Sequence, residues 1–251
     1  MRRGHWGFWL RLAVVVLKPL LTLFTKRDWR GREHLPRSGP AIFAVNHIGH
    51  IDPLVMSHFV YDCRRRPQFL AKASMWKVPG FRWVLNGTGQ IPVYRGTADA
   101  ADALRDAVAA MERGDTVILY PEGTTTRDPD MWPMRAKTGV ARLALTTGVP
   151  VIPIAQWGAQ DLYHPQRHKW RLRPRTRVWV WAGPPVDLSP WVDQPLSAEV
   201  LRAATTLIMT TIRDQLAEIR GEQPPAEFYV RSDKDDPDKD RKPDKKPEVQ
   251  K

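Results

Sequence analysis

The sequence predicts an α/β fold with a central, largely parallel sheet flanked by helices. Short apolar runs of strand length alternate along the chain with amphipathic stretches of helical period. Several of these runs also end abruptly in polar or charged residues, which is typical of strands whose carboxyl ends line a ligand crevice. With 251 residues and 42% hydrophobic content, the chain can form one large domain or two small ones around a sizeable core.

The first apolar segment, residues 6–24, has about the length of a membrane span of roughly 20 residues. Arg11, Lys18 and Pro19 interrupt it, and basic residues flank it, which favours a helix lying in the cytoplasmic membrane interface. A single spanning anchor and a helix packed on the domain remain alternatives. The charged apolar core and the lack of a small-x-small site disfavour a cleaved signal peptide. We therefore expect residues 1–27 to form a membrane-interface helix.

Residues 28–221 are expected to form the α/β domain. After a polar, turn-rich stretch, we predict strands at 41–46, 68–72, 89–95, 116–120, 149–155 and 177–181, and helices at 53–61, 97–114, 135–147 and 197–220. Two prolines in 149–155 indicate an edge or irregular strand. Residues 75–85 match neither a helix nor a strand, and could form a second membrane-facing element or a wall of an acyl-chain pocket.

Charge divides the chain unequally. The formal net charge is +12, but residues 222–251 hold eight basic and nine acidic residues, few apolar ones and several prolines. We interpret this segment as a disordered charged tail, which assigns the positive charge to the rest of the chain. A basic surface suits anionic lipid or anionic small substrates. No nucleic-acid-binding motif is present, and the single cysteine, Cys63, excludes an internal disulfide and a four-cysteine zinc site.

The junction between the first predicted strand and its helix carries candidate chemistry. The strand ends in Asn46-His47, and Asp52-Pro53 is a typical helix start. On a continuous helix, residues five apart would point about 140° away from each other, so a contact needs a bend, for which Gly49 is suited. The expected product is an imidazole oriented by a carboxylate, which can act as a general base. A loop histidine beside an ordinary helix cap is the alternative.

Cationic residues recur at the ends of other predicted strands or at a helix start. Lys72 ends one strand, Arg95 ends another, and Lys137 opens a helix. In a parallel sheet these positions converge on the crevice that holds His47 and Asp52, where cations suit a phosphate group. Scattered surface charge is the alternative, although it requires repeated coincidence at strand ends.

A turn with the sequence Pro-Glu-Gly-Thr follows the strand at 116–120. The carboxylate of Glu122 and the backbone of Gly123 and Thr124 suit the hydroxyl groups of a polyol. The sequence thus predicts one crevice with a base, several cations and a hydroxyl-binding turn.

Four blocks between about residues 45 and 154 resemble the glycerolipid acyltransferase family, typified by 1-acyl-sn-glycerol-3-phosphate acyltransferases. In order, they are Asn46-His47-x4-Asp52, Gly89-Gln-Ile-Pro-Val-Tyr-Arg95, Tyr120-Pro-Glu122-Gly123-Thr124 and Val149-Pro-Val-Ile-Pro-Ile154. The resemblance implies that the first block is catalytic, that Arg95 binds substrate phosphate, that the third block binds the acceptor and that the fourth serves the acyl-binding side. Lys72 and Lys137 also lie where the family tends to place lysines.

One position departs from the family pattern. The third block commonly continues with arginine, and here Thr125 occupies that place. Arg127 could substitute for the missing cation, and the acceptor headgroup is left open.

The resemblance implies transfer of a fatty acyl group from acyl-CoA or acyl carrier protein to lysophosphatidate, giving phosphatidate, with no metal and no bound cofactor. Glycerol 3-phosphate or another lysophospholipid is an alternative acceptor. Two other classes remain open: a metal-dependent phosphoesterase using His47, His50 and Asp52, and a non-catalytic protein that binds anionic lipid. Expected partners are therefore the thioester donor, the lysophospholipid acceptor and an anionic membrane surface, without nucleic acid.

Overall fold

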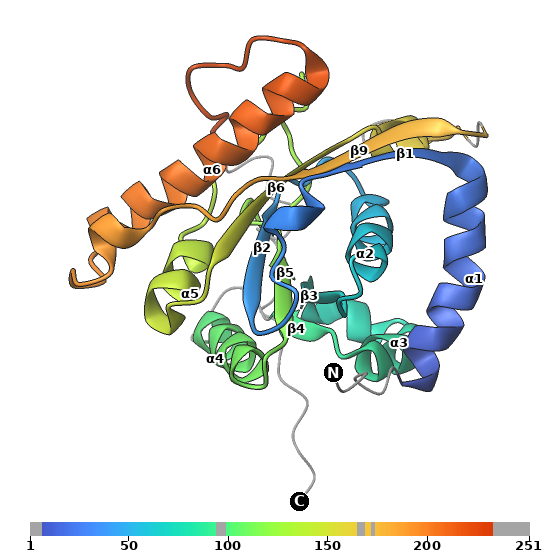
Figure 1. Ribbon diagram of the computed structural model, residues 1–251, viewed down its shortest axis with the longest axis horizontal. Helices are drawn as coiled ribbons and strands as arrows, with labels where there is room; N and C mark the ends of the chain where they lie inside the picture. The colour runs from blue at the N-terminus through green and yellow to red at the C-terminus, as the bar shows by residue number, and fades with distance from the viewer. Residues whose placement is uncertain (1–6, 94–98, 165–168, 172–173, 233–251) are drawn as a thin grey trace, which may run out of the picture.

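The computed structural model describes residues 7–93, 99–164, 169–171 and 174–232 (Figure 1). Its main element is a seven-stranded sheet with the order β1-β9-β6-β2-β5-β3-β4. Every neighbouring pair is parallel except β6 and β9, so the predicted α/β fold with a largely parallel sheet is confirmed. Two short strands, β7 and β8, pair separately.

The strands of the main sheet are β1 (Thr25–Arg30), β2 (Ala41–Val45), β3 (Gln68–Lys72), β4 (Ile91–Val93), β5 (Thr116–Leu119), β6 (Val151–Trp157) and β9 (Thr176–Ala182). The small pair is β7 (Tyr163–His164) and β8 (Lys169–Trp170). The α-helices are α1 (Phe8–Phe24), α2 (Asp52–Asp62), α3 (Phe81–Thr88), α4 (Asp99–Glu112), α5 (Gly139–Thr147) and α6 (Ala198–Arg220). Short 3-10 helices are η1 (Arg32–His34), η2 (Ala73–Lys77), η3 (Ala159–Asp161) and η4 (Ser189–Trp191).

Helices cover both faces of the sheet, with α2 and α1 on one side and α4, α5 and α6 on the other (Figure 1). The central strand β2 is buried along its whole length, and its alternate side chains point to opposite faces. Phe43 and Val45 pack in the core that includes α2, whereas Ile42 and Ala44 pack in the core that includes α4, α5 and α6. A continuous apolar run such as this one is therefore explained by burial on two faces.

The structure adds an edge strand that the sequence pattern did not indicate. The stretch around Asp28 reads as a polar connection, but Thr25–Arg30 forms β1 and pairs in parallel with β9. An edge strand bonds to only one neighbour, and most side chains of β1 are exposed or half-buried, so its composition carries little strand signal. The predicted N-terminal segment, 1–27, thus includes the first half of a sheet strand.

The prediction for the strand after α5 is wrong in one respect. β6 lies inside the sheet, between β9 and β2, and not at an edge. Pro153 is tolerated there because it lies just outside the ladder between β6 and β9, whose first pair is Ile154 and Ala182. The carbonyl of Pro153 instead accepts the N–H of Gly183 at 2.9 Å.

Order also extends beyond the predicted tail boundary at Glu222. The side chain of Arg213 on α6 donates to the carbonyls of Pro225 and Ala226, and Tyr229 pairs with the chain at Met134. Residues 233–251 lie outside the described part of the chain, so the rest of the predicted tail remains a prediction.

The first helix, α1, is 17 residues long and contains Pro19. Within the described ranges, no helix has both the length and the apolar character needed to cross a bilayer. The ion pair between Lys18 and Asp62, 2.7 Å long, joins α1 to the end of α2.

Candidate active site

The carboxyl ends of β2, β3 and β5 meet at one edge of the sheet because these strands are parallel. His47 follows β2, Lys72 ends β3, and the turn containing Glu122 follows β5. The sequence predicted that the strand ends bring these residues together. His47, Lys72 and Glu122, which the structure describes, do follow or end strands at the same end of the sheet. Arg95 lies outside the described residues, so its predicted phosphate contact remains a prediction.

His47 and Asp52 are in direct contact. The Nδ1 atom of His47 lies 3.0 Å from Oδ2 of Asp52, and the same oxygen accepts the backbone N–H groups of Ile48 and Gly49 at 2.6 and 2.8 Å. The carboxylate is fully buried, whereas the imidazole retains 15% of its side-chain exposure. Asp52 is the first residue of α2, and its carboxylate binds the preceding turn instead of capping the helix. This geometry fixes the ring orientation and leaves Nε2 as the outward nitrogen.

The backbone of His47 is held from two further segments. Its N–H donates to Oε1 of Glu122 at 2.8 Å, and its carbonyl accepts the N–H of Thr126 at 2.7 Å. The other carboxylate oxygen of Glu122 accepts the N–H of Met134 at 2.9 Å. Burial raises the pKa of Glu122 to about 8, against the opposing effect of these two N–H donors. The buried carboxylate of Glu122 therefore connects the turn at His47 to the loop that ends at Met134.

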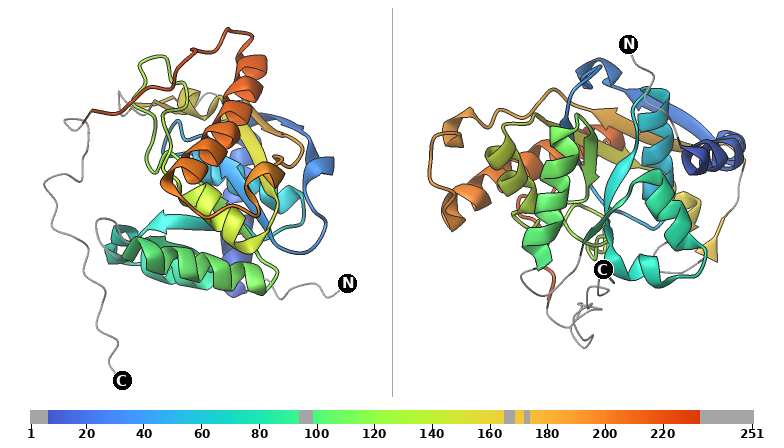
Figure 2. Two further views of the ribbon diagram at one scale, coloured as in Figure 1. Left: turned by 90° about the vertical axis from the view of Figure 1, so that its left-hand side faces the viewer. Right: turned by 90° about the horizontal axis from the view of Figure 1, so that it is seen from below.

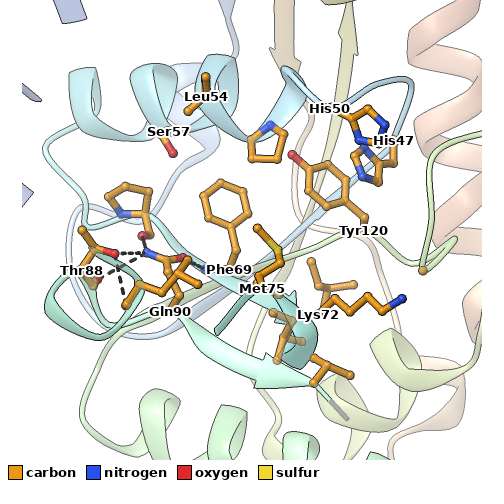
Figure 3. A pocket seen from close by; sticks show the side chains of 18 of the residues that line it. His47, His50, Leu54, Ser57, Phe69, Lys72, Met75, Thr88, Gln90 and Tyr120 are labelled. Carbon is orange, nitrogen blue, oxygen red and sulfur yellow. Dashed lines mark hydrogen bonds between the residues drawn. The ribbon is translucent and has the colours of Figure 1, made fainter. Parts of the chain in front are cut away.

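Tyr120, the residue before the Pro-Glu-Gly-Thr turn, forms one side of the His47 position. The two rings are stacked, with centroids 4.1 Å apart and planes inclined by 19°. Phe69 continues the stack beyond Tyr120, with ring centroids 6.1 Å apart. Figure 3 shows the tyrosine ring beside the imidazole, with Lys72 reaching into the same space. Sequence reasoning gave Tyr120 no role of its own, although it is the first residue of the third family block and ends a predicted buried strand.

The site opens onto a cavity of about 1370 Å³ with walls of two kinds. One part is mainly apolar and combines side chains from α1, α2, β3 and α3, including Val14, Leu54, Phe69, Val84 and Leu85, with polar groups such as Lys18, Ser57 and Thr88 on the same helices. The other part is polar and contains the chemistry-bearing groups His47, Lys72, Gly123, Thr124, Thr125, Thr126, Arg127, Lys137 and Arg142. Such a cavity can take a long apolar chain at one end and an anionic group at the other.

The structure divides the predicted binding residues into two groups. Lys72, Gly123, Thr124 and Lys137 line the cavity, as expected for contacts with a ligand. Asn46 and Glu122 are buried, with exposed fractions of 1% and 3%. These two side chains therefore support the surrounding backbone instead of making the predicted contact with substrate.

Asn46 pairs with Gln156 on β6. The Asn46 side chain accepts the Gln156 N–H at 2.8 Å and donates to the Gln156 carbonyl at 3.1 Å, while the Gln156 amide donates to the Asn46 carbonyl at 2.8 Å. These bonds tie the residue before His47 to the neighbouring strand.

Two arginines lie on the polar wall, near the place where the family pattern lacks its usual arginine. Arg127 was proposed from the sequence as a substitute for the cation missing at Thr125, and it does line the cavity. Arg142, on α5, also lines it and was missed, because a charged residue on a helix normally reads as a solvated face.

The residues required by a metal site are not brought together. His47 is bonded to Asp52, whereas the ring of His50 packs against Tyr163 with centroids 6.1 Å apart. Among the described residues, no three side chains of histidine, cysteine, aspartate or glutamate form a metal-binding group.

Comparison with known proteins gives a consistent result. The family model "Acyltransferase" matches residues 26–157. A chloroplastic 1-acyl-sn-glycerol-3-phosphate acyltransferase from Brassica napus is 29% identical over 137 residues, and an enzyme of the same name from Borreliella burgdorferi is 31% identical over 134 residues. These matches cover 54% and 53% of this chain, and 38% and 52% of the respective relatives, so the chain spans about half or less of their length.

A structural neighbour covers more of both chains. The crystal structure of the 1-acyl-sn-glycerophosphate acyltransferase PlsC from Thermotoga maritima superposes with a TM-score of 0.62 at 25% identity. The superposition covers 86% of this chain and 84% of that one. Because the matched region contains the His47 turn, the Glu122 turn and β6, and more than half of the sequence, the chain belongs to the acyltransferase family.

Proposed function

We propose that this protein is an O-acyltransferase that moves a fatty acyl group from an acyl thioester to the free hydroxyl of lysophosphatidate, giving phosphatidate. The observation that carries the proposal is the contact between His47 and Asp52 at the meeting point of an apolar and a basic cavity wall. A base at this position is adjacent to both the acyl chain and the phosphate group of a bound phosphorylated lipid. The relatives named above support the substrate class.

In the proposed reaction, the Nδ1–H of His47 donates to Asp52, and Nε2 takes the proton from the acceptor hydroxyl. The hydroxyl oxygen attacks the thioester carbonyl carbon, and collapse of the tetrahedral intermediate breaks the carbon–sulfur bond. The proton on His47 then passes to the departing thiolate. Asp52 stabilises the imidazolium, and two backbone N–H groups hold its Oδ2 in place.

The polar wall supplies the contacts for the acceptor. Lys72, Lys137, Arg127 and Arg142 lie on that wall and suit its phosphate group. Arg95 is assigned a phosphate contact from the sequence motif alone. Gly123 and Thr124 remain candidates for the glycerol hydroxyls, while Glu122 acts indirectly by holding the backbone of His47.

The donor is a long-chain acyl-CoA or an acylated acyl carrier protein. The N-terminal segment, 1–27, is assigned to the cytoplasmic membrane interface, with an anionic lipid surface as partner, and residues 28–221 to catalysis. The apolar outer positions of α1 support this assignment.

The test is release of free thiol from a long-chain acyl-CoA by detergent-solubilised protein, with and without lysophosphatidate. The His47→Ala variant should lose about 10²–10⁴-fold in turnover, the usual contribution of a general base. His34→Ala, in η1 and outside the cavity lining, is the matched histidine control and should match wild type.

Near-normal turnover in His47→Ala would overturn the proposed mechanism. If wild type releases no thiol, the assay is repeated with acylated acyl carrier protein and with glycerol 3-phosphate or other lysophospholipids. Failure of all donors and acceptors would favour a lipid-binding protein without catalysis.

A further inference from the structure

We propose that the segment Ala73–Thr88, which comprises η2 and α3, forms one bilayer-docking face together with α1, and that acceptor lipid enters the cavity directly from the bilayer between these helices. The inference rests on the proposed function for the identity of the lipid. It adds a second docking element far from α1 in the sequence, and a route for the substrate.

Exposed apolar side chains are concentrated on these two segments. Of the fifteen large hydrophobic residues that are exposed in the described part of the chain, ten lie in α1 or between Ala73 and Thr88. They are Phe8, Leu12, Val15, Val16, Leu20, Leu23, Met75, Val78, Phe81 and Trp83. Trp83 is 64% exposed and Val78 53%, which is costly in water and favourable in an interface. The concentration indicates a surface that is covered when the protein works.

The two segments are in direct contact, so their exposed faces adjoin. The views in Figures 1 and 2 place α3 beside the N-terminal end of α1. A Cβ atom added at Gly87 would lie only 2.0 Å from the ring of Trp9. Glycine at this position therefore permits the close approach of α3 to α1, and any larger residue would separate the helices.

The charge of the two segments matches an anionic lipid surface. Residues 7–24 and 73–88 contain no aspartate or glutamate, and their charged residues are Arg11, Lys18, Lys77 and Arg82. Arg11, Lys77 and Arg82 are exposed, whereas Lys18 is joined to Asp62. Basic residues near an anionic leaflet are attracted to it and strengthen binding. An anionic bilayer is therefore the occupant that both the apolar and the charged groups fit.

The inner faces of the same helices form part of the cavity. Leu10, Val14 and Leu17 of α1 line it, and so do Val84 and Leu85 of α3. Each helix thus has apolar side chains both toward the cavity and toward the outside, which is unusual for a helix on a water-facing surface. A lipid passing between them keeps its chain in apolar surroundings while its phosphate moves toward the basic wall.

The binding test uses the full chain and sedimentation with vesicles of phosphatidylcholine, alone or mixed with phosphatidylglycerol. Replacing Val78 and Trp83 together by aspartate should lower the partition coefficient for mixed vesicles by about ten-fold or more. The matched control is Val192→Asp, since Val192 is 59% exposed but follows η4 and lies outside both segments. Equal binding by the double variant and the control would overturn the docking face.

The entry route needs a second readout. With lysophosphatidate embedded in vesicles, acyl transfer by the Val78/Trp83 double variant should fall about ten-fold, while transfer to a detergent-dispersed acceptor should stay within about two-fold. An equal loss in both assays would assign these residues to the cavity wall and contradict entry from the bilayer.

The His47→Ala variant separates this inference from the proposed function. It should bind vesicles as wild type does, because binding requires no chemistry. If wild type binds vesicles but transfers no acyl group, that result contradicts the enzyme assignment alone.

Discussion

Two histidine–aspartate pairs lie at the ends of α2 and differ in what surrounds the carboxylate. At the start of the helix, His47 contacts Asp52 at 3.0 Å; at its end, His58 lies 3.6 Å from Asp62. Asp52 is otherwise bound by backbone N–H groups, which carry no net charge. Asp62 is instead bound by Lys18 at 2.7 Å and lies 3.7 Å from Arg27.

This difference supports the choice of His47 over His58 as the proposed base. At His58, burial and the nearby charges of Arg27 and Lys18 outweigh the attraction of Asp62 and lower the pKa to about 4. Its side chain is 2% exposed, against 15% for His47. The proposed general base is therefore assigned to the pair whose carboxylate is bound by backbone N–H groups and whose ring is partly exposed. Three predictions test this comparison.

The largest effect is expected from exchanging each aspartate for asparagine. Asp52→Asn removes the charge that stabilises the protonated imidazole, and should lower kcat by about 100-fold or more. Asp62→Asn breaks the contacts with Lys18 and Arg27 but should leave kcat within about two-fold, because His58 takes no part in the proposed reaction. Steady-state kinetics and the unfolding temperature of both variants check this. A comparable loss of kcat in Asp62→Asn would break the comparison.

A smaller effect concerns the acid sensitivity of folding. Because the pKa of His58 is about 4 in the folded protein and about 6.5 in the unfolded chain, the unfolded state binds more protons between these values. Stability from neutral His58 is complete above pH 6.5 and is lost as the pH falls toward 4. Between pH 7.5 and pH 5 the loss should be about 2 kcal/mol.

The measurement is the free energy of unfolding at both pH values for wild type and His58→Gln. The variant should lose less stability over this interval, whatever its stability at pH 7.5. An identical loss in the two proteins would show that His58 is not held neutral by its surroundings.

The smallest effect concerns the ring stacked on His47. Tyr120→Leu should lower kcat by about 2–10-fold, the range expected from an aromatic pair worth about 0.5–1.5 kcal/mol. Tyr120→Phe keeps the stacked ring and should retain near-normal kcat. If phenylalanine fails as badly as leucine, the hydroxyl matters and not the stacking. The pH dependence of kcat for both variants shows whether the protonation of the base has changed.

Much of the fold could be predicted because its signals are local. The buried strand β3 and the helix α6, whose Ser197 side chain accepts the N–H of Val200, occur close to their predicted positions. The edge strand β1 could not be recognised, since it is stabilised by backbone pairing with β9, about 150 residues away. Likewise, nothing in the sequence around Pro153 shows that it lies just outside the ladder between β6 and β9.

The contact between His47 and Asp52, and the presence of Lys72 in the same cavity lining as His47, could be predicted from residue type and position at the ends of elements. The site was not predictable where tertiary contacts redirect a polar group. The motif placed Glu122 beside the acceptor, but both of its oxygens are occupied by backbone N–H groups from distant segments. Asn46 is similarly occupied by Gln156, 110 positions along the chain. Tyr120 was missed because stacking is a relation between two rings, and the sequence shows only one of them at a time.

The direct passage from α1 to the sheet has a mechanical consequence. Helix α1 ends at Phe24 and β1 begins at Thr25, so no linker separates them, and the Thr25 side chain also bonds the Leu21 carbonyl at 2.5 Å. A membrane helix on a flexible tether would let the enzyme tumble above the bilayer. In the docking proposed above, the tilt of α1 sets the tilt of the sheet, and the fold determines the height of His47 above the lipid.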